Sequence, residues 1–169
     1  RLAGKRHISE RPPSVETRDE IGHWEIDTVL GKGKPCIVTL VERATGYVLI
    51  GKMRARTVAE LNRATFALIS SAAPPVRTIT ADNGTEFHGY ADLEATTQAR
   101  FFFATPHHSW ERGSSENANG LIRQYLPKRT SMTRLSQDRC DAIARRLNTR
   151  PRKRHDFRTP EEELELRST

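Results

Sequence analysis

Cysteine is scarce in this sequence, with Cys36 and Cys140 as the only two among 169 residues. Both lie inside apolar patterns, and they are too few and too far apart to indicate a disulfide framework or a Cys-x-x-Cys metal site. Long apolar runs are also lacking: no stretch approaches the roughly eighteen residues of a membrane span, and the start does not resemble a signal peptide. We therefore expect a soluble, cytoplasmic protein in a reducing compartment, with no membrane association.

Acidic residues are outnumbered by basic ones. The chain has 28 Lys and Arg against 21 Asp and Glu, and its pI is near 9.9. This surplus of positive charge favours a polyanionic partner, for which nucleic acid is the first candidate. A basic surface without such a partner is the alternative, because net charge bears on association and not on fold.

The length suits one domain, large enough to bury a core but too small for two independent ones. Residues 1 to 20 are polar and charged, contain Pro12-Pro13 and show no sustained periodicity, so we predict a linker or N-terminal arm there. The folded domain is expected at residues 21 to 169. Since the chain begins at Arg1 without Met, we also expect a further region upstream.

Strand patterns dominate the first part of this domain. Residues 24 to 30, 35 to 41 and 47 to 52 are rich in apolar residues and joined by short Gly-containing turns, which is typical of an antiparallel meander. Capping-box spacing of Thr57 and Glu60 then predicts a helix that ends before Pro74-Pro75. A short strand ending at Asp82, a weaker helix and another strand complete the predicted order β-β-β-α-β-α-β; their ranges are 77 to 81, 90 to 98 and 100 to 104.

Three more helices are predicted after Pro106. Ser114 or Ser115 should cap the first, which has an apolar face and ends before Pro127. Ser136 should cap the second, and Thr159-Pro-Glu-Glu should begin a short third.

The first candidate catalytic residue, Asp27, interrupts an apolar strand. Alternation places it on one face with His23 and Glu25, while Trp24 and Ile26 point the other way. Taken alone, Asp27 could be a solvated residue at a strand edge or end.

The second candidate, Asp82, closes the fourth predicted strand in Thr80-Ala-Asp-Asn-Gly-Thr-Glu-Phe. The Asn83-Gly84 turn would aim its side chain outward from the carboxyl end of the strand, which is where α/β sheets bind ligands. The alternative is that Asp82 serves only the turn.

The third candidate, Glu116, is on the first turn of a predicted helix and faces away from its apolar stripe. Asn119 and Arg123 follow on the same face, giving one polar strip. A purely structural role, stabilisation at a helix N-terminus, is the alternative. Together, three such carboxylates fit a two-metal phosphoryl-transfer site, because Mg²⁺ prefers oxygen ligands and metal relieves the repulsion among clustered acids.

Four motifs occur in order along the chain. They are His23-Trp-Glu-Ile-Asp27, the run from Thr80 to Phe87, the run from Gly113 to Lys128, and Leu147-Asn-Thr-Arg-Pro-Arg-Lys153. With this ordered set, the sequence from about Ile8 onward resembles the bacterial insertion-sequence transposases of family thirty, which are DDE enzymes.

The resemblance implies an α/β, RNase H-like fold: a mixed five-stranded sheet, three antiparallel strands then two parallel, flanked by helices. Residues 21 to 169 would be an integrase-type catalytic core with a basic C-terminal helical segment. The resemblance also implies that Asp27, Asp82 and Glu116 bind two Mg²⁺ ions, with Mn²⁺ as a substitute.

The implied activity is metal-dependent 3′-end cleavage and strand transfer, with transposon ends and target DNA as partners. It further implies a homo-oligomer in the DNA complex, an N-terminal DNA-binding region outside this chain, and a bacterial, nucleoid-associated enzyme. Two alternatives are an RNase H-like nuclease that does not join strands and an inactive DNA-binding or assembly module. The intact acid set counts against the inactive module.

The loop from Thr105 to Arg112 departs from the aromatic and proline pattern expected of the family, because His107 and His108 lie there. These histidines have no Cys-x-x-Cys partner nearby, which disfavours zinc. Trp110 could stack on a DNA base or pack against the sheet rim.

Other predicted DNA contacts are basic or amide side chains. Asn119, Arg123 and Lys128 would lie beside Glu116, and the basic run contributes Arg150, Arg152, Lys153 and Arg154. Such residues would contact phosphates without reading sequence. The alternative for the run is a solvated helix end.

Overall fold

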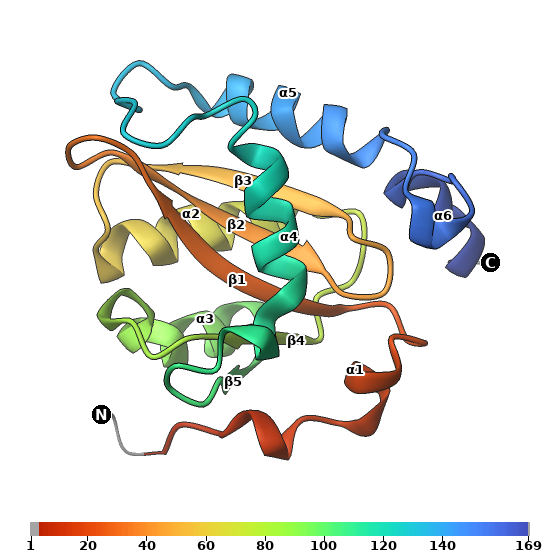
Figure 1. The fold of residues 1–169 in the computed structure, drawn as a ribbon. Coiled ribbons are helices and arrows are strands. Elements are labelled where there is room, and N and C mark those ends of the chain that lie inside the picture. Colours follow the sequence, from red (N-terminus) through yellow and green to blue (C-terminus); the bar gives the residue numbers. More distant parts are fainter. Residues whose placement is uncertain (1–3, 169) are drawn as a thin grey trace.

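The computed structural model describes residues 4 to 168 (Figure 1). A five-stranded sheet has the strand order β3-β2-β1-β4-β5. Its strands are β1 (His23–Leu30), β2 (Cys36–Glu42), β3 (Val48–Met53), β4 (Thr78–Ala81) and β5 (Arg100–Phe103). β1, β2 and β3 pair antiparallel, whereas β4 pairs parallel with both β1 and β5. The predicted mixed sheet is confirmed, and the arrangement is an RNase H-like fold.

Helices cover both faces of the sheet. They are α1 (Pro13–Thr17), α2 (Val58–Ser71), α3 (Tyr90–Thr97), α4 (Gly113–Ile122), α5 (Gln137–Asn148) and α6 (Pro160–Arg167). Short 3-10 turns also occur: η1 (Ile8–Glu10), η2 (Thr85–Gly89), η3 (Ser109–Arg112) and η4 (Lys153–His155). In Figure 1, α2 and α3 lie behind the sheet, while α4 crosses its front. None of the helices within residues 4 to 168 is long and apolar enough to cross a membrane.

Alternation along β1 divides the core into two layers. Trp24 and Ile26 are fully buried in the layer that includes side chains of α2 and α3. Val29, on the opposite face, is buried with Ala118 and Ile122 of α4 and with residues of α5. The face of β1 that carries Asp27 is therefore the face that α4 crosses.

Three predicted helix starts are confirmed by their caps. The side chains of Thr57, Ser136 and Thr159 accept hydrogen bonds from the backbone N–H groups of Glu60, Arg139 and Glu162. Each bond satisfies one of the donors that a helix leaves unpaired at its N-terminus. The fourth prediction is wrong: α4 begins at Gly113 directly after η3, with Arg112 and not Ser114 or Ser115 at the N-cap.

The segment before residue 20 lies along the β5 edge of the sheet. The backbone N–H of Phe103 donates to the Arg6 carbonyl at 2.8 Å, and Ile8 and Val15 are buried. The predicted arm therefore also contributes apolar residues to the packed interior. Two apolar residues in a polar stretch are too few to predict this burial from the sequence. Residues 1 to 3 of that range, and residue 169 of the predicted core, lie outside the described residues.

Candidate active site

The parallel register of β1 and β4 places two of the predicted acids at equivalent positions, side by side. Glu25 lies opposite Thr80, so two residues further along each strand come Asp27 and Asp82. Asp82 directly follows the end of β4. The two carboxylates thus lie on neighbouring strands, at the carboxyl end of β4, where α/β sheets bind ligands.

Asp27 accepts two hydrogen bonds and has one cationic neighbour. Its Oδ1 accepts from the backbone N–H of Thr28 at 2.9 Å, and its Oδ2 accepts from Nδ2 of Asn119 at 2.9 Å. The cationic neighbour is the Arg112 guanidinium, with Nη1 at 3.6 Å from Oδ1. Burial raises the pKa of the Asp27 carboxyl above its ordinary value, and the charge of Arg112 only partly opposes this rise. A further cation beside Asp27 would lower that pKa.

Asp82 is aimed by the turn that follows it. Its Oδ1 accepts from the backbone N–H of Gly84 at 2.7 Å. A Cβ on Gly84 would come within 2.9 Å of that same oxygen and would collide with the Glu86 carboxylate. Gly84 has a φ of −61°, so its backbone is open to any residue, but a side chain here would displace the carboxylates of Asp82 and Glu86 from their present positions.

Arg112 links the two acids. Besides its contact with Asp27, its Nη2 lies 3.7 Å from Oδ2 of Asp82. Its side chain is largely buried, with a relative exposure of 16%. One positive group therefore lies between two carboxylates that would otherwise repel each other.

Glu116 lies nearby but does not join this pair. It is exposed in the first turn of α4, one helical turn before Asn119, which donates to Asp27. Across residues 4 to 168, no three His, Cys, Asp or Glu side chains converge closely enough to hold one metal ion. The structure thus brings together Asp27 and Asp82 and places the third predicted acid on the adjoining helix face.

The donor set fits a divalent metal. Asp27 and Asp82 already share one cationic group, and carboxylate oxygens are the ligands that Mg²⁺ prefers. Arg112 would have to leave its present position to admit an ion between them. The place of Arg112 between the two acids could not be foreseen from the sequence, where it is one of many arginines.

Glu25 is a further residue that the sequence analysis did not single out. It is fully buried, its Oε1 accepts from the backbone N–H of Ser115 at 2.9 Å, and its Oε2 pairs with Arg43. Glu25 therefore satisfies a free N–H group in the first turn of α4, which explains why no serine caps this helix. It also ties α4 to β1 two residues before Asp27.

Three residues of the strip predicted beside Glu116 lie together on one surface. Asn119, Arg123 and Lys128 line a shallow cavity of about 420 Å³ together with Thr28. Arg123 donates to the Leu30 carbonyl at 2.9 Å, so its guanidinium lies against the end of β1. Contact of these residues with DNA stays a prediction.

Trp110 projects from η3, the turn that also carries Arg112. Its side chain is 70% exposed, and its ring stacks on His108 at a centroid distance of 4.4 Å. Packing against the sheet rim, one of its two predicted roles, is therefore wrong. His108 also lines a hollow of about 310 Å³ with Asp82 and Arg112, so an exposed aromatic pair borders the acid site.

The predicted basic run is divided by the fold. Arg150 donates to Oε1 of Gln124 and to the Tyr125 hydroxyl, beyond the C-terminal end of α4. Arg152, Lys153 and Arg154 instead line a separate cavity that also includes Gly113 and Ser114 of α4. Pro151 separates the two groups.

No protein-family model matches the chain. It is 46% identical over 155 residues to the transposase for insertion sequence element IS1086 of Cupriavidus metallidurans, covering 90% of this chain and 46% of that protein. It is 38% identical over 164 residues to the transposase for IS4351 of Bacteroides fragilis, covering 96% and 50%.

A third relative is transposase InsI for element IS30A of Escherichia coli, with 37% identity over 159 residues, covering 94% of this chain and 42% of that protein. The sheet order, with Asp27 on β1 and Asp82 directly after β4, is that of an RNase H-like α/β domain. The chain belongs to the IS30-type family of bacterial insertion-sequence transposases. It spans about half the length of the curated relatives it matches.

The position of Arg112 between the two acids leads to a prediction about metal binding in the absence of DNA. Replacing Arg112 by Gln should tighten Mn²⁺ binding several-fold, because the cation that competes for Asp27 and Asp82 is lost. A partly exposed ion pair worth up to about 1 kcal/mol corresponds to roughly fivefold in affinity. Calorimetric titration with Mn²⁺, without DNA, measures the change.

Arg63→Gln is a matched control, since Arg63 pairs with Glu60 on α2, away from the acids. Its Mn²⁺ affinity should equal that of the wild type. Equal affinity of the Arg112 and Arg63 variants would show that Arg112 does not compete with the metal.

Proposed function

We propose that this chain is the catalytic domain of a DDE transposase and that Asp27, Asp82 and Glu116 hold two Mg²⁺ ions, or Mn²⁺ in their place. The observation that carries the proposal is the meeting of Asp27 and Asp82 around a single cationic group, at the carboxyl end of β4 in an RNase H-like sheet. Membership of the transposase family supports the same reaction.

The proposed reaction has two phosphoryl transfers. In the first, water attacks a phosphodiester at the element's end, the P–O3′ bond breaks, and a 3′ hydroxyl is released. In the second, that 3′ oxygen attacks a phosphorus of target DNA; a new P–O3′ bond forms and the target's P–O3′ bond breaks. Bound metal ions would activate the attacking oxygen and stabilise the leaving one.

The residues around the acids have distinct parts in this proposal. Asn119 orients the Asp27 carboxylate through its hydrogen bond, and the Gly84 N–H orients that of Asp82. Arg123 and Lys128 would contact phosphates of the strand that reaches the acids, and Trp110 would stack on an unpaired base. Action as a homo-oligomer, with a separate N-terminal region recognising the ends, belongs to the same proposal.

A branched DNA that mimics a joined product tests the chemistry. Because phosphoryl transfer is reversible, the domain should resolve such a branch without recognising an element end. When the labelled branched DNA is incubated with the purified chain and Mn²⁺, we expect two products, a resealed target strand and a released element end. Nicks without resealing would favour an RNase H-like nuclease, and binding without any reaction would favour an inactive module.

Metal binding also predicts a change in stability. A ligand that binds only the folded state at ten times its dissociation constant adds about 1.4 kcal/mol, which is roughly 3 to 6 °C in melting temperature for a chain of this size. Mn²⁺ should raise the melting temperature of the wild type, while the Asp27→Asn/Asp82→Asn double variant should not respond. An equal response of both proteins would place the metal elsewhere.

A further inference from the structure

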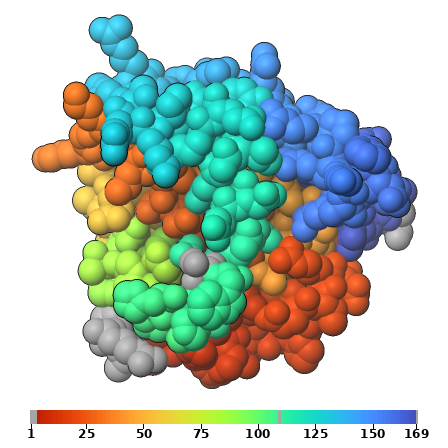
Figure 2. Space-filling model, viewed as in Figure 1, coloured from red at the N-terminus to blue at the C-terminus, as the bar shows by residue number. Residues whose placement is uncertain are grey.

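A cavity of about 380 Å³ lies against α4, on the side of the helix away from Glu116 and Asn119. Four of its lining residues are cationic, namely Arg18, Arg152, Lys153 and Arg154, and none of its lining residues is acidic or aromatic. They come from both ends of the chain: Arg18 follows α1, and the other three precede or open η4. Figure 2 shows the face on which these N-terminal and C-terminal segments meet beside α4.

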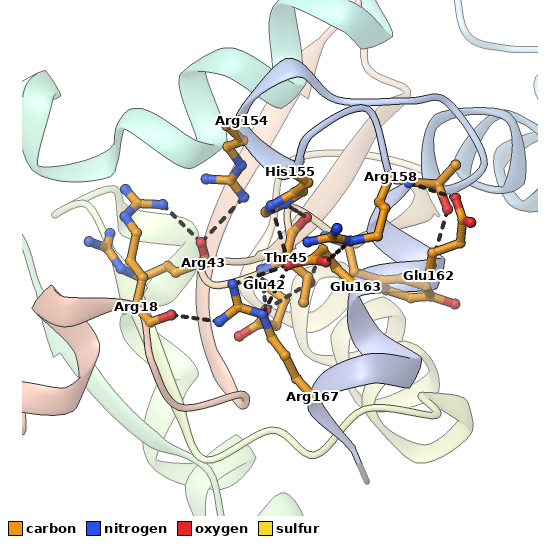
Figure 3. A network of polar contacts seen from close by, with 12 residues as sticks. Arg18, Glu42, Arg43, Thr45, Arg154, His155, Arg158, Glu162, Glu163 and Arg167 are labelled. Atoms are coloured by element: carbon orange, nitrogen blue, oxygen red, sulfur yellow. Dashed lines mark hydrogen bonds and ion pairs between the residues drawn. The ribbon is translucent and has the colours of Figure 1, made fainter.

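The arginines of this cavity contact neutral atoms instead of carboxylates. Arg18 and Arg154 both donate to the backbone carbonyl of Arg43, at 2.8 and 3.5 Å, as Figure 3 shows. Arg152 donates to the Leu147 carbonyl at 2.8 Å, and its buried Nε has no hydrogen-bond partner in the described part of the chain. None of these three guanidinium groups forms a close ion pair within residues 4 to 168, although more distant carboxylates still act on the charges of Arg18 and Arg154.

The acidic side chains near the cavity already pair with other residues. Glu163 pairs with Arg158 at 2.7 Å and with Arg167 at 3.3 Å, and both arginines are outside the cavity lining. Glu42 accepts from the N–H groups of Gly22 and Thr45. Structural ion pairing therefore accounts for Arg158 and Arg167 but not for the cations that face the cavity.

The clustering carries an electrostatic cost. Burial lowers the pKa values of Arg18, Arg152 and Arg154 from their ordinary range, and neighbouring arginines lower them further. Arginine nevertheless stays charged at neutral pH. Like charges held in a partly buried hollow create a positive potential that a bound anion would relieve.

We propose that this cavity binds a backbone phosphate of DNA, giving the domain a second DNA contact on the far side of α4 from the acids. Guanidinium groups match phosphate oxygens in shape and charge. The absence of an aromatic lining residue argues against a base as the bound group. DNA as the source of the phosphate rests on the proposed function; free inorganic phosphate is the other source of the same chemistry.

Salt-dependent DNA binding tests the proposal without catalysis. Fluorescence anisotropy with a random-sequence duplex, in EDTA and at 50 to 200 mM salt, compares the wild type with Arg18→Gln/Arg154→Gln. Each lost phosphate contact should remove about 0.9 from the slope of log K against log salt, so the double variant should lose about 1.8. Over this salt range, wild-type affinity should then fall about twelvefold more than that of the variant.

Arg134→Gln/Arg139→Gln removes the same charge elsewhere. Both arginines are exposed near the start of α5, where Gln137 contacts Lys52 of β3, whereas Thr45 and Val48 put the cavity at the other end of that strand. This control should keep the wild-type slope. Lys153→Gln, an exposed single change, should lower the slope by about 0.9 even if the arginine double variant folds poorly.

The outcomes are distinct. If the wild type binds DNA and the cavity variants have the same salt slope as the control, the cavity does not bind a DNA phosphate, and the proposed function is unaffected. A wild type that binds no DNA at any salt would overturn the function, and the DNA assignment of the pocket with it. Inorganic phosphate that stabilises the wild type against heat, without the slope change, would assign the cavity to a free anion and also overturn the proposal.

Discussion

Asp27→Asn, Asp82→Asn and Glu116→Gln should each reduce cleavage and joining to background while leaving DNA binding largely intact. These changes keep the shape of the side chain but remove an ionised metal ligand. Metal ions contribute several kcal/mol to charge stabilisation in such transition states, and about 4 kcal/mol corresponds to roughly a thousandfold in rate. Resolution of the branched DNA, followed with Mg²⁺ and with Mn²⁺, measures the loss.

Folding must be checked alongside activity. Because burial raises the pKa of Asp27, its ionised form is less favourable in the folded protein than in the unfolded chain at neutral pH. Asp27→Asn should therefore melt at the wild-type temperature or above it. Asp138→Asn is the matched control for Glu116→Gln, since Asp138 is the acid in the first turn of α5, and it should stay active. Near-normal activity in any of the three acid variants would show that the triad is assigned wrongly.

The local parts of this fold were predictable because they depend on short-range patterns. Alternation in β1 correctly placed Trp24 and Ile26 on one face and Asp27 on the other. Hydroxyl caps correctly marked the starts of α2, α5 and α6. These signals lie within a few residues of the structure that they specify.

The missed features all depend on long-range packing. The bond from Ser115 to Glu25 joins residues 90 positions apart, and the one from Arg18 to Ser114 spans 96. No periodicity within a window links such residues. For the same reason, the sequence predicts the basic run as one surface, whereas in the fold Arg150 lies against Tyr125 and Arg154 against Arg43.

The acid pair is an intermediate case. The residue types and motifs indicated that Asp27 and Asp82 act together, but their proximity depends on the register between β1 and β4. The position of Arg112 between them could not be inferred, because its contacts with both acids depend on long-range packing that leaves no pattern in the sequence.

Glu25→Gln should lower both stability and activity. Loss of its charge leaves Arg43 unpaired in the interior, where only 7% of that side chain is exposed. Breaking a buried ion pair by removing one partner typically costs about 3 to 5 kcal/mol, and 3 kcal/mol corresponds to roughly 6 to 12 °C in melting temperature for a chain of this size. Thermal melting and branch resolution, measured on the same protein below its melting transition, check both effects.

Glu42→Gln separates positioning from stability. Glu42 is as deeply buried as Glu25, but its carboxylate accepts from Gly22 and Thr45 and does not contact α4. Both variants should therefore be destabilised, while only Glu25→Gln should lose activity per folded molecule. A shift of about 1 Å in a reacting group can cost on the order of a hundredfold in rate, so a loss of tenfold to a hundredfold is expected.

The metal dependence identifies the cause of that loss. If Glu25 holds the first turn of α4 against β1, its replacement moves Glu116 relative to Asp27, and a higher Mn²⁺ concentration should be needed for half-maximal activity. Glu42→Gln should keep the wild-type requirement, because the Ser115 N–H still bonds to Glu25. Equal metal requirements in the two variants would mean that the position of α4 does not depend on this carboxylate, and that packing of Ala118 and Ile122 against the sheet is sufficient to set it.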